Sequence, residues 1–192
     1  MGFLNNVTVT ENDSLHNVEE NVELIAKMFG IQDKQYNELV FNLTPTDNSF
    51  ADNYLAENNL LETQFLIGMH PGCSTLKNHI NRRWDTGKFA ELIDMICHDF
   101  NARVLIFGGP DEENLKQEII SKVKKSNPIA VRTENLAQSA SLIKKCNLFI
   151  TNDSSLMHVS ASQQTPTIAL IGPTNTNYIK PWKTEYEIAS LN

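Results

Sequence analysis

Small polar residues lie between two apolar runs in the stretch from Leu148 to Thr174, where a phosphate could bind. The first run, Leu148–Thr151, reads as a buried strand, and residues from about Leu156 to Gln163 read as a helix. Backbone N–H groups and hydroxyls in such a turn point off the carboxyl edge of a sheet, where the helix dipole is positive. The turn residues are Asn152, Asp153, Ser154 and Ser155. This turn therefore suits an anion, above all a phosphate.

Other interpretations of these residues remain open. His158 stands one helical turn after Ser154 and could share a face with the turn hydroxyls, but a lone helical histidine is more often packed or exposed. Asn152 or Asp153 could also cap the helix as a purely structural device. No second histidine or cysteine stands at ligand spacing in the sequence, so we expect neither a metal nor another cofactor. The three scattered cysteines indicate reduced thiols.

A second polar loop runs from Pro71 to Arg83, after another apolar run. Ser74 and Thr75 offer hydroxyls and N–H groups, and Arg82 and Arg83 could supply positive charge for a diphosphate. The alternative is that the arginine pair is solvated or stacks on the neighbouring indole of Trp84.

A third loop, Gly108–Glu113, is rich in glycine. It has neither the G-x-G-x-x-G nor the G-x-x-x-x-G-K-[ST] pattern, so a dinucleotide fingerprint and a P-loop are not supported. Asp111 and Glu112 either stabilise the start of the following helix or accept hydrogen bonds from a ribose.

The elements that carry these loops alternate along residues 65–192. Continuously apolar strands between amphipathic helices are typical of a doubly wound, Rossmann-like α/β fold, a parallel sheet covered on both faces. Ligands of such sheets lie beyond the carboxyl ends of the strands, so the three loops should converge. We predict strands at 65–70, 103–107, 128–131, 148–151, 167–171 and 186–189, and helices at 84–100, 111–125, 135–145 and 156–163.

Residues 1–64 read as a helical lead-in and interdomain connector, before the domain at 65–192. Apolar residues at helical spacing predict a helix over 15–29 that stops at Gly30, followed by a strand at 39–43, a turn at 45–49 and a helix at 52–61. The net charge of −7 is uneven, since residues 1–64 carry −9 and the remainder +2. The second part can therefore receive an anionic small ligand, and no basic face indicates nucleic-acid binding.

The sequence has no apolar run near the roughly 20 residues of a membrane span. Its first residues lack the basic region and long apolar segment of a secretory signal. A cytoplasmic protein is expected.

Three motifs in order resemble glycosyltransferase family 9, the lipopolysaccharide heptosyltransferases, and most of all their heptosyltransferase II branch. They are Thr151-Asn-Asp-Ser-Ser-Leu-Met-His158 with Thr165-Pro-Thr-Ile-Ala-Leu-Ile-Gly-Pro-Thr174, His70-Pro-Gly-Cys-Ser-Thr75 with Arg82-Arg-Trp84, and Val104-Leu-Ile-Phe-Gly-Gly-Pro110. The resemblance implies one half of a GT-B architecture, in which two Rossmann-like domains face a cleft. It also implies transfer of heptose from ADP-heptose to a lipid A–core acceptor, with inversion and without metal.

The resemblance assigns a role to each loop. Ser74 and Thr75 would meet the donor phosphates, and Arg82 would balance their charge where the family usually has lysine. Asp111 or Glu112 would hold the ribose, and Glu134 and Leu136 would lie near the adenine. The pyrophosphate and heptose hydroxyls would be held by Asp153, Ser154 and Ser155, with His158 supporting that turn.

This sequence departs from the family in two ways. Ser155 stands where the family usually has glycine, which bears on how closely the sugar approaches. The resemblance also begins in the family's interdomain region, so the acceptor site and the catalytic base, a carboxylate of the amino-terminal domain, have no counterpart here. Membrane contact would be peripheral, at the inner membrane, through the lipid acceptor.

Two other functions stay open. The chain could be a non-catalytic nucleotide-sugar binding or assembly module that pairs with another chain through residues 1–64. It could also be an unrelated sugar-nucleotide enzyme of the same architecture, such as an epimerase, which would prefer UDP-sugars.

Overall fold

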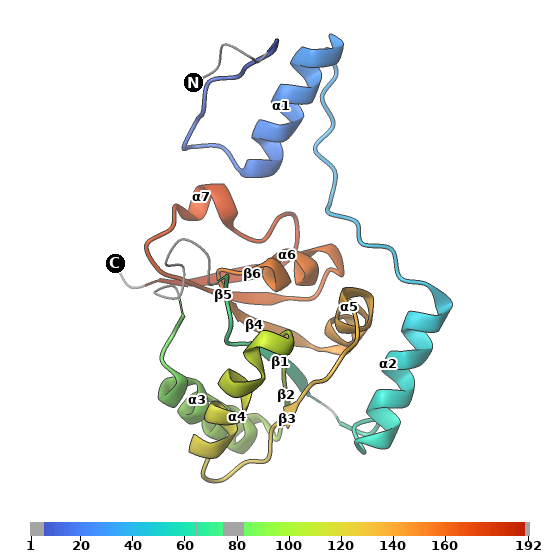
Figure 1. The fold of residues 1–192 in the computed structure, drawn as a ribbon, viewed down its shortest axis with the longest axis vertical. Helices are drawn as coiled ribbons and strands as arrows, with labels where there is room; N and C mark the ends of the chain where they lie inside the picture. Colours follow the sequence, from blue (N-terminus) through green and yellow to red (C-terminus); the bar gives the residue numbers. More distant parts are fainter. Residues whose placement is uncertain (1–5, 64, 75–82, 191–192) are drawn as a thin grey trace.

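The computed structural model describes residues 6–63, 65–74 and 83–190. Its centre is a sheet of six parallel strands in the order β3-β2-β1-β4-β5-β6 (Figure 1), which confirms the predicted fold class. Strands β1 to β3 extend the sheet in one direction and strands β4 to β6 extend it in the other. The strand order therefore reverses between β1 and β4, which are neighbours. The strands are β1 (Leu66–His70), β2 (Arg103–Ile106), β3 (Ile129–Ala130), β4 (Leu148–Asn152), β5 (Thr167–Ile171) and β6 (Tyr186–Ser190).

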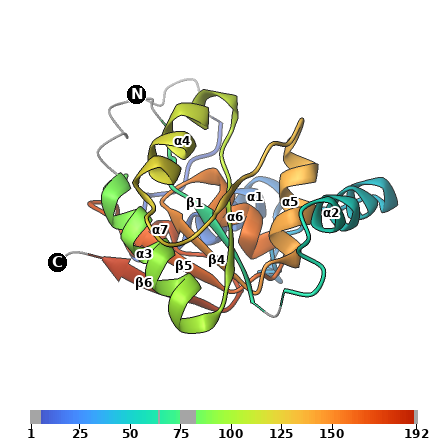
Figure 2. The same ribbon diagram turned by 90° about the horizontal axis from the view of Figure 1, so that it is seen from below.

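Helices cover both faces of the sheet (Figure 2). On one face, α3 (Thr86–Phe100) and α4 (Glu113–Lys122) pack on Ile67, Met69 and Ile106. On the other, α5 (Leu136–Lys145) and α6 (Ser155–Ser162) pack on Leu66, Leu105 and Phe149. Alternate residues of one strand thus enter opposite cores, as the pleat of a strand requires.

The amino-terminal helices lie at the edge of this sandwich. The helix α2 (Pro45–Glu57) packs beside α5, whereas α1 (Asn17–Phe29) stands beyond the short α7 (Thr176–Ile179) (Figure 1). At the start of α1, the ring of His16 lies 4.6 Å from that of Trp182, its Nε2 lies 2.8 Å from the Lys180 carbonyl oxygen, and Asn17 Nδ2 donates to the Tyr178 hydroxyl. Among the described residues, none of the helices has the length and apolar character needed to cross a bilayer.

Three sequence predictions in this region are wrong. The segment 39–43 forms no strand, and its Phe41 carbonyl accepts from Gln163 Nε2 at 2.8 Å instead of from a neighbouring strand. The expected turn at 45–49 is the first turn of α2, where the N-cap residue Thr44 and Asp47 form a reciprocal capping box and Pro45 is the first helical residue. The expected helix at 52–61 therefore begins earlier, at Pro45, and ends at Glu57. The helix α7 was not foreseen either.

An acid-sensitive contact lies at the start of α4. Lys116 is only 2% exposed, and its Nζ donates to the Val131 carbonyl at 2.6 Å and pairs with Glu113 Oε2 at 2.9 Å. Hydrogen bonds from Gln117 and then Lys116 lower the pKa of Glu113 to about 2. A carboxylate whose folded-state pKa is depressed stabilises the fold above its unfolded-state pKa and loses that effect as the pH falls toward the folded value.

We therefore expect Glu113→Gln to lower the melting temperature at pH 7, and the gap to wild type to narrow between about pH 4.5 and pH 2. Thermal unfolding followed by circular dichroism across this range measures the gap. Glu91→Gln, on the exposed face of α3, is the matched control. A gap that stays constant with pH would contradict the prediction.

Candidate functional site

The three polar loops meet at the carboxyl edge of neighbouring strands β2, β1 and β4. A cavity of about 340 Å³ opens there. Its walls come from the ends of β1 and β2, the segment after β3 and the amino-terminal turns of α5 and α6. The lining residues are His70, Gly108, Gly109, Pro110, Glu112, Thr133, Glu134, Asn135, Leu136, Ser139, Ser155 and Leu156.

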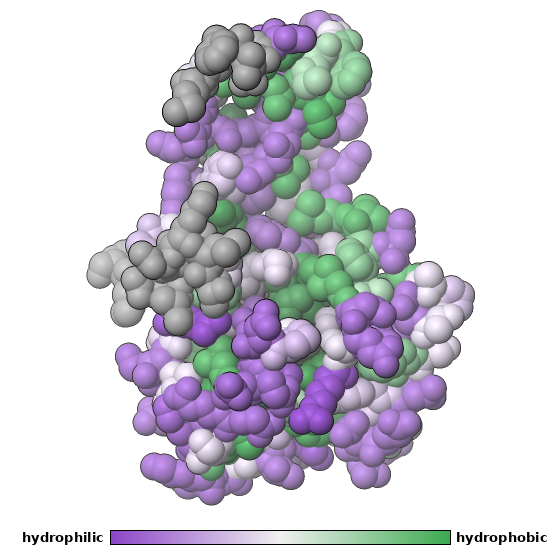
Figure 3. All heavy atoms as spheres, viewed as in Figure 1, coloured by the Kyte–Doolittle hydropathy of each residue, from purple (hydrophilic) through white to green (hydrophobic). Residues whose placement is uncertain are grey.

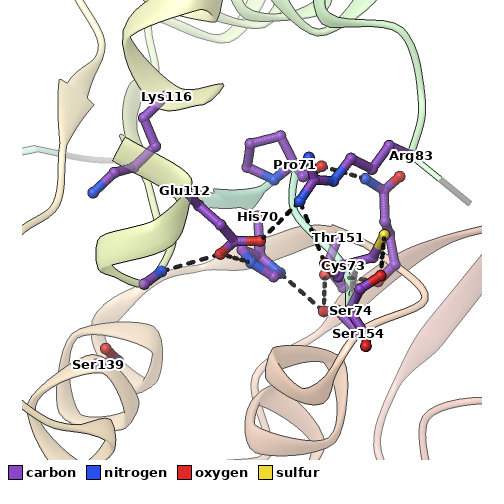
Figure 4. A network of polar contacts seen from close by, with 12 residues as sticks. His70, Pro71, Cys73, Ser74, Arg83, Glu112, Lys116, Ser139, Thr151 and Ser154 are labelled. Atoms are coloured by element: carbon purple, nitrogen blue, oxygen red, sulfur yellow. Dashed lines mark hydrogen bonds and ion pairs between the residues drawn. The ribbon is translucent and has the colours of Figure 1, made fainter. Parts of the chain in front are cut away.

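Among the described residues, Glu112 is one of the two carboxylates that line this cavity, with Glu134, and Figure 4 shows the contacts of Glu112. Its Oε2 accepts from the Gly109 N–H and lies 3.0 Å from His70 Nε2, while its Oε1 lies 3.7 Å from an Arg83 nitrogen. Burial alone would raise the pKa of Glu112, but hydrogen bonds and charge from His70, together with Gly109 and Arg83, hold it below the usual value. The carboxylate is therefore ionised and fixed in place at neutral pH.

A glycine makes room for this carboxylate. A Cβ built on Gly72 would lie 1.6 Å from Glu112 Oε1. The Pro71–Gly72 backbone thus passes directly against Glu112, and any side chain at this position would displace it.

The turn after β4 is tied to the other loops. Asn152 Nδ2 donates to the Pro71 carbonyl at 2.6 Å, and its Oδ1 accepts from the Trp84 N–H at 3.2 Å. Both ends of the 71–83 loop are therefore fastened to β4. Ser154 is the N-cap residue of α6 and makes no side-chain capping bond, so the N-cap position falls on neither Asn152 nor Asp153.

Asp153 is 8% exposed, and its Oδ2 accepts from Thr174 Oγ1 at 2.9 Å. This contact joins the β4 turn to the Gly-Pro-Thr turn after β5. His158 is half-buried on α6. Burial first and the charge of His16 second lower the pKa of His158, while Asp153 opposes them. His158 is therefore neutral at pH 7, which suits support of the turn rather than binding of an anion.

The structure brings several sequence-predicted residues together and separates others. The cavity is lined by four of the predicted residues, Glu112, Glu134, Leu136 and Ser155. Asp153 and Ser154 lie buried beside it, and His158 follows one turn into α6. Asp111 is exposed and does not line the cavity, and Ser74, in the first part of the 71–83 loop, is exposed too. Thr75 and Arg82 lie outside the described residues.

Arg83 lies against Glu112 and the Cys73 carbonyl, not on the indole of Trp84, so for this arginine the stacked alternative is wrong. Sequence reasoning also missed His70, Ser139 and Thr174. A signal existed for His70, because a polar residue ends an apolar strand at the edge where ligands bind. The described residues hold no group of three or more His, Cys, Asp or Glu side chains placed to bind a metal.

The chain is similar to a family model and to several known proteins. The family model for glycosyltransferase family 9 (heptosyltransferase) matches residues 1–192. Lipooligosaccharide heptosyltransferase 2 of Campylobacter jejuni is 34% identical over 127 residues, which are 62% of this chain and 37% of that protein. Lipopolysaccharide heptosyltransferase 2 of Escherichia coli K12 is 31% identical over 104 residues, which are 52% of this chain and 30% of that protein.

Solved structures share the fold. The family 9 glycosyltransferase of Veillonella parvula superposes with a TM-score of 0.84 at 25% identity, covering 96% of this chain and 51% of its own. E. coli ADP-heptose heptosyltransferase II gives a TM-score of 0.76 at 24% identity, covering 100% of this chain and 59% of that one. This chain thus spans about half the length of the solved relatives, and about a third of the curated relatives' length is aligned with it. The resemblance seen in the three motifs is confirmed, and the chain belongs to glycosyltransferase family 9.

Proposed function

We propose that residues 65–192 are the donor-binding domain of an inverting heptosyltransferase of lipopolysaccharide core biosynthesis, and that residues 1–64 connect it to the remainder of the enzyme. The observation that carries the proposal is the cavity at the carboxyl ends of β1, β2 and β4, with the ionised Glu112 in its wall. Its volume of about 340 Å³ falls within the range of small-molecule sites.

The cavity suits the nucleoside of an ADP-sugar. Glu112 Oε1 keeps lone pairs for ribose hydroxyls, because the His70 and Gly109 bonds occupy Oε2. Leu136 is 46% exposed and offers an apolar surface to the adenine, with Glu134 beside it. Of Asp111 and Glu112, only Glu112 lines the cavity, so Glu112 would be the residue that binds the ribose.

The diphosphate would lie at the start of α6. The first N–H groups of this helix have no side-chain cap from Ser154, and the helix dipole is positive there. Ser74, Thr75 and Arg82 would reach the same phosphates from the 71–83 loop. As the bond from the sugar's anomeric carbon to the phosphate oxygen breaks, ADP leaves with its charge held by these groups.

The sugar would lie beside Asp153 and Ser155. A carboxylate binds sugar hydroxyls and repels phosphates, so Asp153 suits the heptose rather than the diphosphate. The acceptor, a lipid A–core, and the carboxylate that deprotonates its hydroxyl would belong to the part of the enzyme that this chain does not match. The E. coli heptosyltransferase solved with ADP has the same fold, with a TM-score of 0.68 at 20% identity, which supports the architecture alone.

Isothermal titration calorimetry of the purified chain tests the proposal. We expect it to bind ADP and ADP-heptose and to bind UDP more weakly, because the exposed apolar side chain of Leu136 in the cavity wall would contact more of the larger adenine ring. Absence of binding at millimolar ADP-heptose would contradict a donor-binding role. A preference for UDP-sugars would favour another class of sugar-nucleotide enzyme.

A second candidate function, an assembly module, is favoured by the surface of α1. Ile25, Met28 and Phe29 are 50%, 53% and 73% exposed, although they belong to an amphipathic helix. Figure 3 shows apolar atoms gathered at this end of the molecule. Such a face would pack against a polypeptide that supplies the missing length of the relatives.

An activity assay with ADP-heptose and a truncated acceptor separates the two candidates. Turnover by this chain alone would contradict a purely binding or assembly role. Donor binding without turnover would agree with a domain whose catalytic base lies on another part of the enzyme.

A further inference from the structure

A buried lysine joins two segments that build the cavity around Glu112, which we call the nucleotide cavity. Lys116, the fourth residue of α4, is only 2% exposed, and lysine is rarely buried to this degree unless its charge is paired. Its Nζ donates to the Val131 carbonyl at 2.6 Å and pairs with Glu113 Oε2 at 2.9 Å. In Figure 4 the side chain of Lys116 extends away from Glu112, so its charge serves these two partners rather than the carboxylate of Glu112.

Both partners of the lysine lie next to walls of the nucleotide cavity. Glu113 directly follows the segment 108–112, four of whose residues line the cavity. Val131 lies two residues before the segment 133–136, all of whose residues line it. One ammonium group therefore ties the wall that follows β2 to the wall that follows β3.

A second cavity, of about 300 Å³, adjoins the nucleotide cavity. Both cavities are lined by the turn 108–110 and by Thr133, and Lys116 lines the second one. The stem of the lysine passes along the shared turn, since a Cβ built on Gly108 would lie 3.5 Å from Lys116 Cδ, whereas a Cβ on Gly109 would meet nothing within 4 Å. Residues that line two cavities are packed less completely than residues of a closed core, so their position depends on individual bonds.

We propose that Lys116 is a positioning residue that fixes the separation of these two walls and thereby sets the preference of the nucleotide cavity for adenine. The inference rests on the proposed donor-binding function. A gap of about 0.5–1 Å between a base and a wall forfeits a quarter to a half of their dispersion attraction. Adenine has two fused rings and touches more of the walls than uracil, so it loses more when the walls move apart. The diphosphate would lie at the start of α6, which the bonds of Lys116 do not touch.

Replacement by methionine separates this role from a role in stability alone. A buried ion pair can often be replaced by apolar side chains of similar volume with little loss of stability. Lys116→Met keeps an unbranched apolar stem in the same space but removes the donor to the Val131 carbonyl and the charge beside Glu113. The variant therefore fills the site of the lysine without tying the two walls together.

Calorimetric titration of the purified chain with ADP, UDP and pyrophosphate tests the proposal. We expect Lys116→Met to bind ADP about five- to tenfold more weakly than wild type and UDP about twofold more weakly, with the affinity for pyrophosphate unchanged. The decisive quantity is the ratio of ADP affinity to UDP affinity. Partial unfolding lowers both apparent affinities by the same factor and leaves this ratio as it was. An unaltered ratio in Lys116→Met would overturn the proposal.

Lys122→Met is the matched control on the same helix. Lys122 pairs with Glu118 at 2.7 Å, but its side chain is 43% exposed and it lines neither cavity. The variant makes the same change of charge and should leave all three affinities as in wild type. An equal loss of ADP preference in Lys122→Met would assign the effect to the charge of α4 and would contradict the proposal.

Glu113→Gln covers the case in which Lys116→Met does not fold. It keeps the lysine and its bond to Val131 but removes the charge of the other partner, and we expect it to lower the ADP to UDP ratio by about two- to threefold. An unchanged ratio in this variant would count against the proposal.

The wild-type titrations separate this inference from the proposed function. Wild-type chain that binds no ADP would overturn the proposed function and this inference together. Wild-type chain that binds ADP and UDP equally well, or that prefers ADP as strongly as Lys116→Met does, would overturn this inference alone.

Discussion

Replacing Phe149 with alanine should lower the free energy of unfolding by about 3–5 kcal/mol, because the cavity left in the core cannot close. Phe149 is the second residue of β4, is 0% exposed, and its ring packs edge-on against Phe107 at 5.5 Å between centroids. It lies in the core between the sheet and helices α2, α5 and α6. Urea unfolding monitored by circular dichroism measures the loss.

The neighbouring strand shows why this ring is held so tightly. A Cβ on Gly68 would lie 2.6 Å from Phe149 Cδ2 and 3.0 Å from Phe107 Cε2, so Gly68→Ala forces two rings to move in a close-packed core. We expect this change to cost about 1–3 kcal/mol. Phe149→Leu opens space beside Gly68, so the double variant should be less destabilised than the sum of the two single variants, by about 0.5–3 kcal/mol.

Phe100→Ala is the matched control, since Phe100 ends α3 and is 64% exposed. It should cost about 1 kcal/mol or less. Strict additivity of Gly68→Ala and Phe149→Leu would show that the ring and the glycine do not share this space.

The sheet could be predicted from sequence because its strands are short apolar runs separated by helical periodicity. Even the boundary of β5, Thr167–Ile171, agrees with the predicted strand. The prediction failed around Pro45, where a capping box and a proline at the first helical turn were read as a turn cluster. The same residue types serve both structures, and only the burial of Ala51 and Leu55 against α5 decides for a helix.

The loops of the site were foreseen, but the contacts inside it were not. The sequence could not decide which of Asp111 and Glu112 lies in the site, since both are at the start of the same helix. The two differ because they are successive residues of the 3₁₀ helix Pro110–Glu112, whose side chains point in different directions. His70 gave no helical or ligand spacing because its partners, Glu112 and Ser154, are 42 and 84 residues away. Thr174 likewise reaches Asp153 only through the pairing of β4 with β5.

The second large effect is expected at Asp153, the partner of Thr174, and it concerns which of two ligands, ADP-heptose or ADP, loses affinity. Asp153→Ala should weaken ADP-heptose binding by about 1–3 kcal/mol, or about 5–150-fold, as expected when a charged hydrogen-bond partner of a sugar is lost. Affinity for ADP should stay the same or rise, because the change removes a carboxylate, 8% exposed, from beside the proposed phosphate site, and ADP has no sugar contact to lose. Calorimetry with both ligands on the same preparation measures the two affinities.

Two variants separate charge from position at Asp153. Asp153→Asn keeps the size of the side chain but not its charge, and should lose most of the sugar-dependent affinity. Thr174→Val removes the hydroxyl that donates to Asp153 Oδ2 and leaves the carboxylate in place, so a smaller loss for ADP-heptose and none for ADP is expected. If Asp153→Ala weakened ADP and ADP-heptose equally, the residue would act on the nucleotide or on the fold of the turn, and the sugar would have to be held by other residues. If neither affinity changed, the donor sugar would lie on the far side of the β4 turn, away from the β5 loop.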